Sequence, residues 1–488
     1  MVVYHPKFYA GLSDTILIKR GNQMDNKILK TPYVEFLGSN ANEVTGSANL
    51  VRFMNYHILV DYGLRQTSNE QEDYVVNLKR HKDVKPKKLD AIILTHCHID
   101  HSGLIPKLYA EGATCPLYIP QGTKGLLTLM WQDSHKIFVS EHERFNRTPL
   151  YEQSAIDVAL EHIVEVDLRS KYCINDHISF TYYNAQHIVK SRQIYLELND
   201  GNNIKKLGFT GDYSTYKDRY WLNQRDDLPM VDMLIGECTY SNSNRTIKER
   251  DRRTDINKLK LAIDYALEHK SKVIIPTFSL NRLQDILAML YETYGGKLPI
   301  KTAVDSPLGK NISRIWKKLI DKDYELWDRI LDCDDIYWID DFKMSVALDK
   351  LQEPLLVIAG GGMLSGGRAT YWCKHNLSNK YNYIIFSGYN TPESPAGQIR
   401  SGKLKSVKID GVDVRCAAHT LAFNSFSSHA DHKHLLEYYT TLPYNKICLV
   451  HSEQDSKAKF AAELKESLSK ANRSSRVVIT NKDSKVHF

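Results

Sequence analysis

Residues 95–103 read Thr95-His96-Cys97-His98-Ile99-Asp100-His101-Ser102-Gly103, so three imidazoles and a carboxylate fall within six positions. The apolar run 91–94 predicts a buried strand, and residues 104–109 predict the start of a helix. Alternate side chains of an extended segment point the same way, so His96 and His98 can face one cation. Asp100 and His101, where the chain turns into the helix, can face a second. Imidazole nitrogen and carboxylate oxygen are ligands that Zn²⁺ accepts, so the stretch predicts a metal site.

The composition is that of an ordinary soluble protein with more than one domain. The 488 residues are 42% hydrophobic and 25% charged, enough for two or three units with sizeable cores. The net charge of +7 suits a polyanionic ligand, although many proteins with such a charge bind none. The eight scattered cysteines form no Cys-x-x-Cys pair, which argues against a disulfide framework and a cysteine zinc cluster. With no secretory signal and no run of 18 apolar residues, we expect a cytoplasmic protein that contacts no membrane.

The first half of the chain predicts short strands joined by turns. Residues 1–30 are a polar lead-in. Apolar runs broken by Gly and Asn follow between residues 33 and 63, and helical periodicity rich in charge covers residues 123–165. Strands return between residues 178 and 237. The charged run 244–255 predicts an exposed loop that opens a helix.

From about residue 256 the pattern changes to an alternation of helices and strands. Such alternation predicts a parallel sheet flanked by helices, and therefore a second α/β domain. The stretch from about residue 447 again predicts α/β structure. Helices are expected at 256–270, 282–294, 308–321, 342–351 and 366–378, and strands at 273–276, 300–304, 336–339, 355–359 and 383–386.

Three further candidate ligands each follow a predicted strand: His187, Asp212 and His451. Taken alone, each has an ordinary structural explanation, because polar residues gather at strand ends in any protein. Their shared position at the ends of predicted strands favours a functional explanation. In α/β architectures the carboxyl ends of strands meet in one crevice, so ligands from distant segments can converge there.

These residues together make the chain resemble the β-CASP nuclease family of metallo-β-lactamase-fold hydrolases, over residues 33–455. The family's His-x-His-x-Asp-His motif matches residues 96–101. Its lone histidine, its bridging aspartate and the aspartate that supports the metal loop match His187, Asp212 and Asp61.

Three more family motifs are present in the expected order. They match Glu237 in Gly236-Glu237-Cys238-Thr239-Tyr240, His429 in Ser425-Phe426-Ser427-Ser428-His429, and His451 in Val450-His451-Ser452-Glu453. Residues 276–282, 305–308 and 361–364 resemble other signatures of the family.

The resemblance implies an α/β fold, a metallo-β-lactamase αββα sandwich with an inserted parallel-sheet β-CASP domain. The expected division is a lead-in at 1–30, the first part of the core at 31–241, the β-CASP domain at 242–424 and the second part of the core at 425–488. In this family the active site lies in the cleft between core and insertion, where a strand of nucleic acid can be threaded.

The resemblance also implies a site with two Zn²⁺ ions, for which Mn²⁺ is an alternative. His96, His98 and His187 would hold one ion, Asp100, His101 and His451 the other, and Asp212 both. Two cations about 3.5–4 Å apart can stabilise the charge of phosphodiester hydrolysis, and zinc lowers the pKa of water towards about 7. Asp100 is thus also a catalytic candidate, and His429, oriented by Glu237, is the candidate that protonates the leaving group.

Two residues of the inserted domain are candidates for substrate binding. Arg282 can grip a backbone phosphate through two N–H groups, although an arginine at a helix start also has structural uses. Ser306 is a candidate of the same kind. Departures from the family pattern remove no metal ligand and concern substrate fit instead; they are Gln186, Lys190, Asn281, Ser452 and Gly360-Gly361.

The histidine at position 451 favours RNA, because DNA-repair members of the family usually carry valine there. The minimal architecture favours an endonuclease acting on single-stranded RNA over a 5′–3′ exoribonuclease. Two other hypotheses are an RNA-binding or scaffold subunit with a weak site, and a hydrolase of a small phosphodiester or ester. A homodimer or an RNA-processing complex is expected from relatives.

Overall fold

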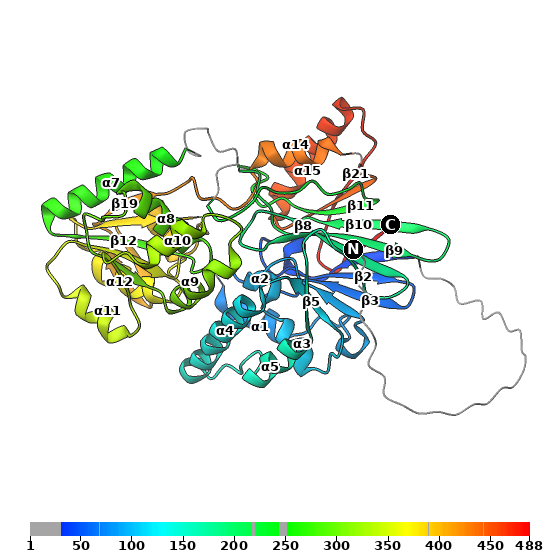
Figure 1. Ribbon diagram of the computed structural model, residues 1–488, viewed down its shortest axis with the longest axis horizontal. Coiled ribbons are helices and arrows are strands. Elements are labelled where there is room, and N and C mark those ends of the chain that lie inside the picture. The colour runs from blue at the N-terminus through cyan, green and yellow to red at the C-terminus, as the bar shows by residue number, and fades with distance from the viewer. Residues whose placement is uncertain (1–30, 68, 217–219, 244–250, 389, 443) are drawn as a thin grey trace, which may run out of the picture.

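The computed structural model describes residues 31–67, 69–216, 220–243, 251–388, 390–442 and 444–488 (Figure 1). The predicted lead-in at 1–30 and residues 244–250 of the charged run lie outside the described residues. Among the residues inside these ranges, no helix combines the length and the apolar character needed to cross a bilayer.

One body of the molecule contains two seven-stranded sheets. The first sheet has the order β22-β1-β2-β3-β4-β5-β6, and the second has the order β21-β20-β11-β10-β9-β8-β7. The first comprises Tyr33–Phe36 (β1), Asn49–Phe53 (β2), Tyr56–Val60 (β3), Ala91–Ile93 (β4), Leu117–Pro120 (β5), Ile163–Val166 (β6) and Lys485–His487 (β22). The second comprises Lys171–Cys173 (β7), Ile178–Asn184 (β8), Arg192–Asn199 (β9), Ile204–Phe209 (β10), Met233–Glu237 (β11), Lys446–Val450 (β20) and Arg476–Ile479 (β21).

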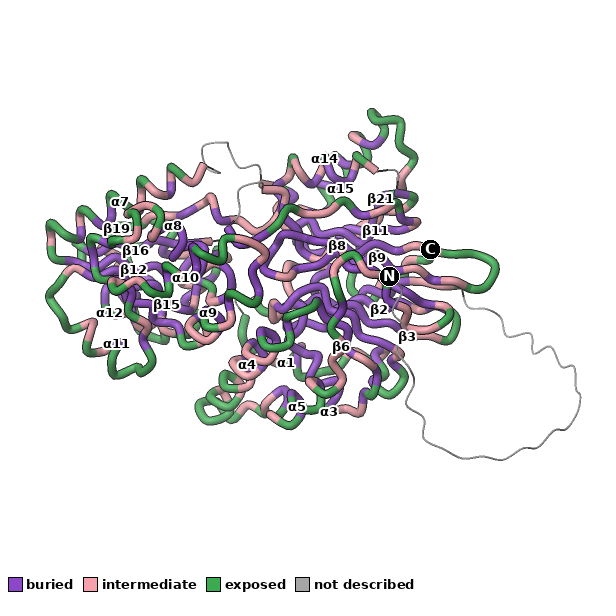
Figure 2. Tube along the Cα trace, viewed as in Figure 1, coloured by how far each residue is buried: buried purple, intermediate pink, exposed green. Residues whose placement is uncertain are grey.

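The two sheets pack face to face through apolar side chains and are covered by helices on their outer faces. Phe36 and Ile93 of the first sheet belong to the same buried cluster as Phe180 and Ile235 of the second. Figure 2 shows this buried centre between exposed outer helices. The predicted αββα sandwich is confirmed. The covering helices are Glu70–Leu78 (α1), Ile99–Ser102 (α2), Ile105–Ala110 (α3), Lys124–Phe145 (α4) and Gln153–Glu161 (α5) on one side, and His432–Thr441 (α14) and Gln454–Lys470 (α15) on the other.

A separate body holds a third sheet of six strands in the order β14-β13-β15-β12-β16-β19 (Figure 1). Every pairing in it is parallel, as the helix–strand alternation predicts. The strands are Lys272–Thr277 (β12), Thr302–Asp305 (β13), Ile336–Trp338 (β14), Leu355–Gly360 (β15), Tyr383–Phe386 (β16) and His419–Ala422 (β19). Around it lie Arg252–His269 (α7), Arg282–Thr293 (α8), Pro307–Leu319 (α9), Tyr324–Leu331 (α10), Phe342–Asp349 (α11), Arg368–Asn376 (α12), Pro395–Arg400 (α13) and a hairpin of Ser406–Ile409 (β17) and Val412–Arg415 (β18).

The chain enters the third-sheet body after β11 and returns before α14. Strand β20, which follows this excursion, lies parallel beside β11, which precedes it. The C-terminal strand β22 pairs antiparallel with β1. The core is therefore built from both ends of the described chain. The predicted boundaries at 242 and 424 stay a prediction; they fall in the two connecting segments, between β11 and α7 and between β19 and α14.

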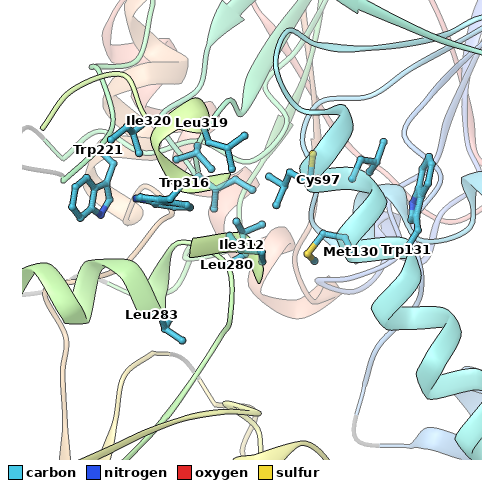
Figure 3. Packing of buried hydrophobic residues seen from close by; sticks show 14 of the residues in the cluster. Cys97, Met130, Trp131, Trp221, Leu280, Leu283, Ile312, Trp316, Leu319 and Ile320 are labelled. Atoms are coloured by element: carbon cyan, nitrogen blue, oxygen red, sulfur yellow. The ribbon is translucent and has the colours of Figure 1, made fainter. Parts of the chain in front are cut away.

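A cluster of three tryptophans joins the two bodies, and Figure 3 shows two of them, Trp221 and Trp316. Trp221, from the segment between β10 and β11, packs edge-on against Trp316 of α9 and Trp327 of α10, with ring centroids 6.1 and 5.5 Å away. All three side chains are fully buried. Buried aromatic side chains contribute strongly to packing, so this contact holds the third-sheet body against the core.

We expect Trp316→Ala to lower the free energy of unfolding by about 3–5 kcal/mol, because it leaves a cavity among the three rings. Urea denaturation followed by circular dichroism measures the loss. Leu261→Ala, which removes a side chain that is 53% exposed on α7, is the matched control and should change stability by no more than about 0.5 kcal/mol. Equal effects of the two substitutions would contradict the role of the tryptophan cluster.

Candidate metal centre

The loop that carries the histidine motif runs from the end of β4 to α2 and is held by backbone hydrogen bonds. The carbonyl oxygens of Asp100 and His101 accept from the N–H groups of Ser47 and Tyr62, at 2.7 and 2.8 Å. Gly63 lies so close to this loop that a Cβ would approach the Asp100 carbonyl oxygen to 1.7 Å. Only glycine fits there, and the close approach fixes the start of α2 against the end of β3.

Asp61, directly after β3, orients this loop. Its Oδ1 accepts from the backbone N–H of Thr95 at 2.8 Å, and its Oδ2 lies 2.7 Å from His101 Nδ1. The residue has a φ of +60° and is buried. A hydrogen bond from Nδ1 to a carboxylate fixes the ring and directs Nε2 the other way. Asp61 therefore presents Nε2 of His101 to the centre, the supporting position that the resemblance implies for it.

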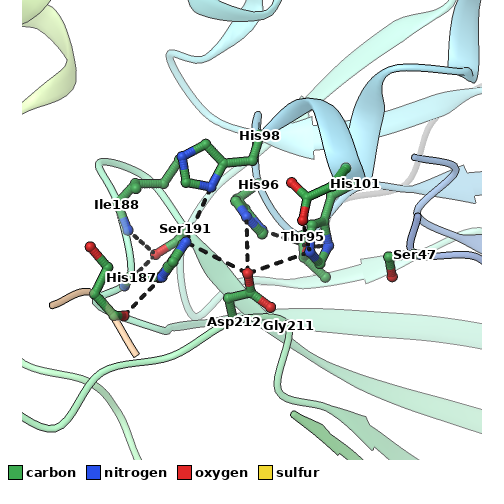
Figure 4. A network of polar contacts seen from close by, with 12 residues as sticks. Ser47, Thr95, His96, His98, His101, His187, Ile188, Ser191, Gly211 and Asp212 are labelled. Atoms are coloured by element: carbon green, nitrogen blue, oxygen red, sulfur yellow. Dashed lines mark hydrogen bonds and ion pairs between the residues drawn. The ribbon is translucent and has the colours of Figure 1, made fainter. Parts of the chain in front are cut away.

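Three histidines form one group of candidate ligands (Figure 4). His96, His98 and His187 each offer a ring nitrogen, and these atoms lie within 4.8 Å of one another. His187 follows β8, and its Nδ1 donates to the carbonyl oxygen of Ser428 at 2.8 Å. Its Nε2 lies 3.1 Å from Nδ1 of His98. The Ser428 carbonyl thus sets the orientation of His187 in the way that Asp61 sets His101.

A second group contains Asp100, His101, Asp212 and His451, whose ligand atoms also lie within 4.8 Å of one another. His451 Nε2 is 3.5 Å from Asp100 Oδ2 and 3.6 Å from Asp212 Oδ1. The other oxygen of Asp212 is 3.7 Å from His96 Nε2 and 3.6 Å from His187 Nε2. Asp212 therefore lies between the two groups. The structure brings together all seven residues that the sequence predicts as ligands.

The donor atoms of this centre fit metal ions. Among the residues that the structure describes, Nε2 of His96, His101 and His451 and Oδ1 of Asp212 are buried and have no hydrogen-bond partner. A buried polar atom without a partner costs about 1–3 kcal/mol, so four in one place indicate that something else binds them. Nitrogen and carboxylate donors at this spacing suit a transition metal such as zinc.

The electrostatics of the first group also favour a metal. Burial lowers the pKa of His98 to about 4, and it lowers the pKa of His96 and His187 well below the usual range. These imidazoles are neutral at pH 7, the form in which histidine binds a metal ion. His101 differs: burial alone lowers its pKa, but the carboxylates of Asp212, Asp100 and Asp61 raise it overall.

Glu237 and His429 form a pair beside the two groups. Glu237 ends β11 and is 1% exposed. Its Oε1 lies 2.9 Å from His429 Nδ1 and accepts from the N–H of Tyr213 at 3.0 Å. A ring nitrogen of His429 also lies within 4.8 Å of ligand atoms of His187 and Asp212. Burial lowers the pKa of His429, but the carboxylates of Glu237, Asp212 and Asp100 together outweigh it and raise the pKa overall.

Thr239 links this pair to the second group, and sequence reasoning missed it. Its hydroxyl donates to Glu237 Oε2 at 2.5 Å and lies 2.9 Å from Nδ1 of His451. The threonine thereby accepts the Nδ1 proton of His451 and leaves Nε2 for the centre. Thr239 lies two residues after Glu237 in the motif 236–240, and this position could have indicated that it belongs to the site.

The two candidates for substrate binding lie at strand ends of the third sheet, apart from the ligand groups. Arg282 donates from Nη2 to the carbonyl oxygen of Phe426 at 2.5 Å and from Nη1 to that of Ser387. Ser306 caps α9 by accepting from the N–H of Gly309 at 3.1 Å, and its hydroxyl lies 2.8 Å from that of Ser279.

The segment that returns from the third sheet to His429 is held by residues of that sheet's body. Asp255 of α7 is fully buried, and its Oδ2 accepts from the N–H groups of Asn424 and Ser425 at 2.9 and 2.8 Å. Arg282 holds the next residue through the Phe426 carbonyl. The inserted body therefore fixes the backbone that presents both His429 and the Ser428 carbonyl.

Three family models match successive parts of the chain. The metallo-beta-lactamase superfamily matches residues 41–158, the Beta-Casp domain matches residues 283–399, and the Zn-dependent metallo-hydrolase RNA specificity domain matches residues 411–474.

Curated relatives and a solved structure agree with these matches. Ribonuclease TTHA0252 of Thermus thermophilus is 28% identical over 425 residues, which cover 85% of this chain and 92% of that protein. Transcription termination factor FttA of Methanocaldococcus jannaschii is 26% identical over 453 residues, covering 88% of this chain and 68% of that protein. A protein of unknown function from Enterococcus faecalis V583 shares the fold, with a TM-score of 0.53 at 13% identity over 94% of this chain and all of that one. The chain therefore combines a metallo-beta-lactamase domain, a Beta-Casp domain and an RNA specificity domain, the combination expected of a β-CASP nuclease.

Proposed function

We propose that this chain is a metal-dependent hydrolase that cuts phosphodiester bonds of single-stranded RNA at internal positions. The observation that carries the proposal is the convergence of seven ligand-type side chains, five buried and two half-buried, with the Glu237–His429 pair at their edge. The relative named as a ribonuclease supports RNA as the substrate. We place the reaction in the cytoplasm, because all eight cysteines are free. An assembly with a second copy or other subunits stays a prediction.

We further propose that two zinc ions occupy the centre. His96, His98 and His187 would hold one, and Asp100, His101 and His451 the other, with Asp212 between them. When bound, two such ions stabilise negative charge on the attacking and leaving oxygens and make a nucleophile available near neutral pH. The protein's own contribution is to fix the ligands: Asp61 orients His101, the Ser428 carbonyl orients His187, and Thr239 orients His451.

His429 is our candidate for the group that gives a proton to the leaving oxygen. Glu237 accepts a hydrogen bond from Nδ1 and stabilises the protonated ring. Nε2 therefore carries a proton that it can donate. We propose that Ser306 contacts the RNA from the strand ends of the inserted body. The guanidinium of Arg282 binds the Ser387 and Phe426 carbonyls and so holds the segment that leads to His429. We propose that its positive charge also attracts the RNA backbone.

The proposal is tested by comparing wild type with Asp212→Ala on internally labelled single-stranded RNA, matching DNA and a circular RNA. We expect wild type with zinc to cut linear and circular RNA and to leave DNA intact, and Asp212→Ala to be inactive because both ligand groups lose their shared carboxylate. Cutting of linear but not circular RNA would show that the protein is an exonuclease and not an endonuclease. If wild type that contains zinc cuts no RNA, the scaffold hypothesis takes its place.

The role of His429 predicts a dependence on the leaving group. We expect His429→Ala to slow cleavage of ordinary RNA about 10²–10⁴-fold and Glu237→Gln to slow it less, because these variants lose or weaken proton donation. An RNA with sulfur in place of the leaving oxygen needs no proton, so both variants should recover most of the loss on it. His142→Ala, on the exposed end of α4, is the control. An equal loss on both substrates would argue that His429 acts otherwise.

The support that Asp61 gives to His101 predicts an effect on metal binding. We expect Asp61→Asn to weaken zinc binding about 10–100-fold while the protein stays folded, since asparagine also tolerates a positive φ. Competition with a chromogenic chelator measures the affinity, and circular dichroism checks the fold. Asp157→Asn, an exposed aspartate on α5, should bind zinc as wild type does. Unchanged affinity in Asp61→Asn would show that the hydrogen bond is not needed.

A further inference from the structure

Phe278 exposes an aromatic ring at the end of β12. Its side chain is 41% exposed, although the six residues of β12 before it are all buried. The apolar neighbours Leu280 and Leu283 are buried in the core and fill the space beneath the start of α8. The packing of the domain therefore does not use the whole Phe278 ring, and an apolar surface of this size in water is unfavourable.

The ring lies over the strand ends of a parallel sheet, where open α/β sheets bind their ligands. A Cβ at Gly362 would lie 3.4 Å from the Phe278 ring, and a Cβ at Gly388 would lie 3.7 Å from it. These glycines follow β15 and β16, which flank β12 in the sheet. The ring thus rests beside two positions without side chains. The paired hydroxyls of Ser279 and Ser306 lie at the same strand ends.

Two guanidinium groups lie at Gly388, the glycine beside the ring. A Cβ at Gly388 would approach Nη1 of Arg282 to 2.6 Å, so this glycine touches both Arg282 and Phe278. The carbonyl oxygen of Gly388 accepts from Nη1 of Arg400 at 2.8 Å. An exposed aromatic ring beside positive charge is the combination by which proteins bind single-stranded nucleic acid without reading its sequence.

The turn that carries Phe278 also contacts the metal centre's loops. Oδ1 of Asn281, three residues further on, accepts from the backbone N–H of Val189 at 3.1 Å, and Val189 is two residues after His187. Arg282, in the same turn, holds the segment that leads to His429 through the Phe426 carbonyl. The turn that carries the ring is therefore tied by hydrogen bonds to the segments that carry His187 and His429.

We propose that Phe278 is a stacking platform for one nucleobase of the RNA, close to the bond that is cut. This inference rests on the proposed function and adds a binding subsite to it. The base stacks on the exposed part of the ring, its phosphate lies toward the arginines, and the scissile bond reaches the metal centre. Because every base has an apolar face, the subsite requires a base but accepts any of the four.

The test uses Phe278→Ala and Phe278→Trp, with Phe342→Ala on α11 as the matched control, a phenylalanine that is 45% exposed. The substrates are RNAs of one sequence with a single mapped cut, either intact or with an abasic ribose at one position near the cut. We expect Phe278→Ala to lower kcat/KM on intact RNA about 5–150-fold, the range for loss of one stacked base. Phe278→Trp and Phe342→Ala should keep wild-type values. Equal zinc content and circular dichroism spectra show that the variants are folded.

The abasic substrates separate stacking from a general effect of the substitution. For wild type, we expect one abasic position to lower kcat/KM by a similar factor, and Phe278→Ala should lose nothing more on that substrate. The platform would be overturned if Phe278→Ala had wild-type kinetics. It would also be overturned if the loss from Phe278→Ala and the loss from the abasic position multiplied at every position tested. Either result would leave the proposed function intact. A wild type that cuts no RNA would instead overturn the proposed function itself.

Discussion

The carboxylate of Asp212 is 3% exposed and lies within 3.7 Å of ring nitrogens from four histidines. A charge buried in this way is strongly unfavourable unless opposite charge compensates it. The histidines of the first group cannot supply that charge, because burial keeps them neutral at pH 7. Bound cations can, and the two face-to-face sheets serve to bring β4, β8, β10, β11 and β20 to one edge around this group. The rest of the architecture depends on that arrangement.

The inserted body contributes to the centre through the segment that joins it to α14. Asp255 and Arg282 hold three successive residues of this segment, and the residues that follow supply the Ser428 carbonyl and His429. Two of the departures from the family pattern add contacts between the two bodies. Lys190 forms an ion pair of 2.9 Å with Asp321, and Asn281 accepts a hydrogen bond from Val189. Movement of the inserted body against the core would therefore displace His429 and the Ser428 carbonyl that orients His187.

The sequence predicted those parts of the molecule that local patterns determine. The ligand loop 96–101 was evident because its residues are neighbours in the chain, and His187, Asp212 and His451 because strand ends converge. The parallel third sheet followed from the alternation of helices and strands. Thr239, Asp255 and the Trp221 cluster could not be predicted, since each acts through contacts between segments far apart in sequence. The carbonyl groups that bind Arg282 could not be predicted for the same reason. The catalytic roles of the site residues stay predictions.

The pairing of both chain ends within one core has a consequence for how the protein is made. Strand β20 and His451 are synthesised after the whole third-sheet body, and β22, which pairs with β1, is synthesised after β20. Before His451 is made, the second ligand group lacks one of its four members. A growing chain on the ribosome thus carries an incomplete set of candidate ligands until the segment after the third-sheet body has been made. The order of segments along the chain therefore delays assembly of the full ligand set until His451 has left the ribosome.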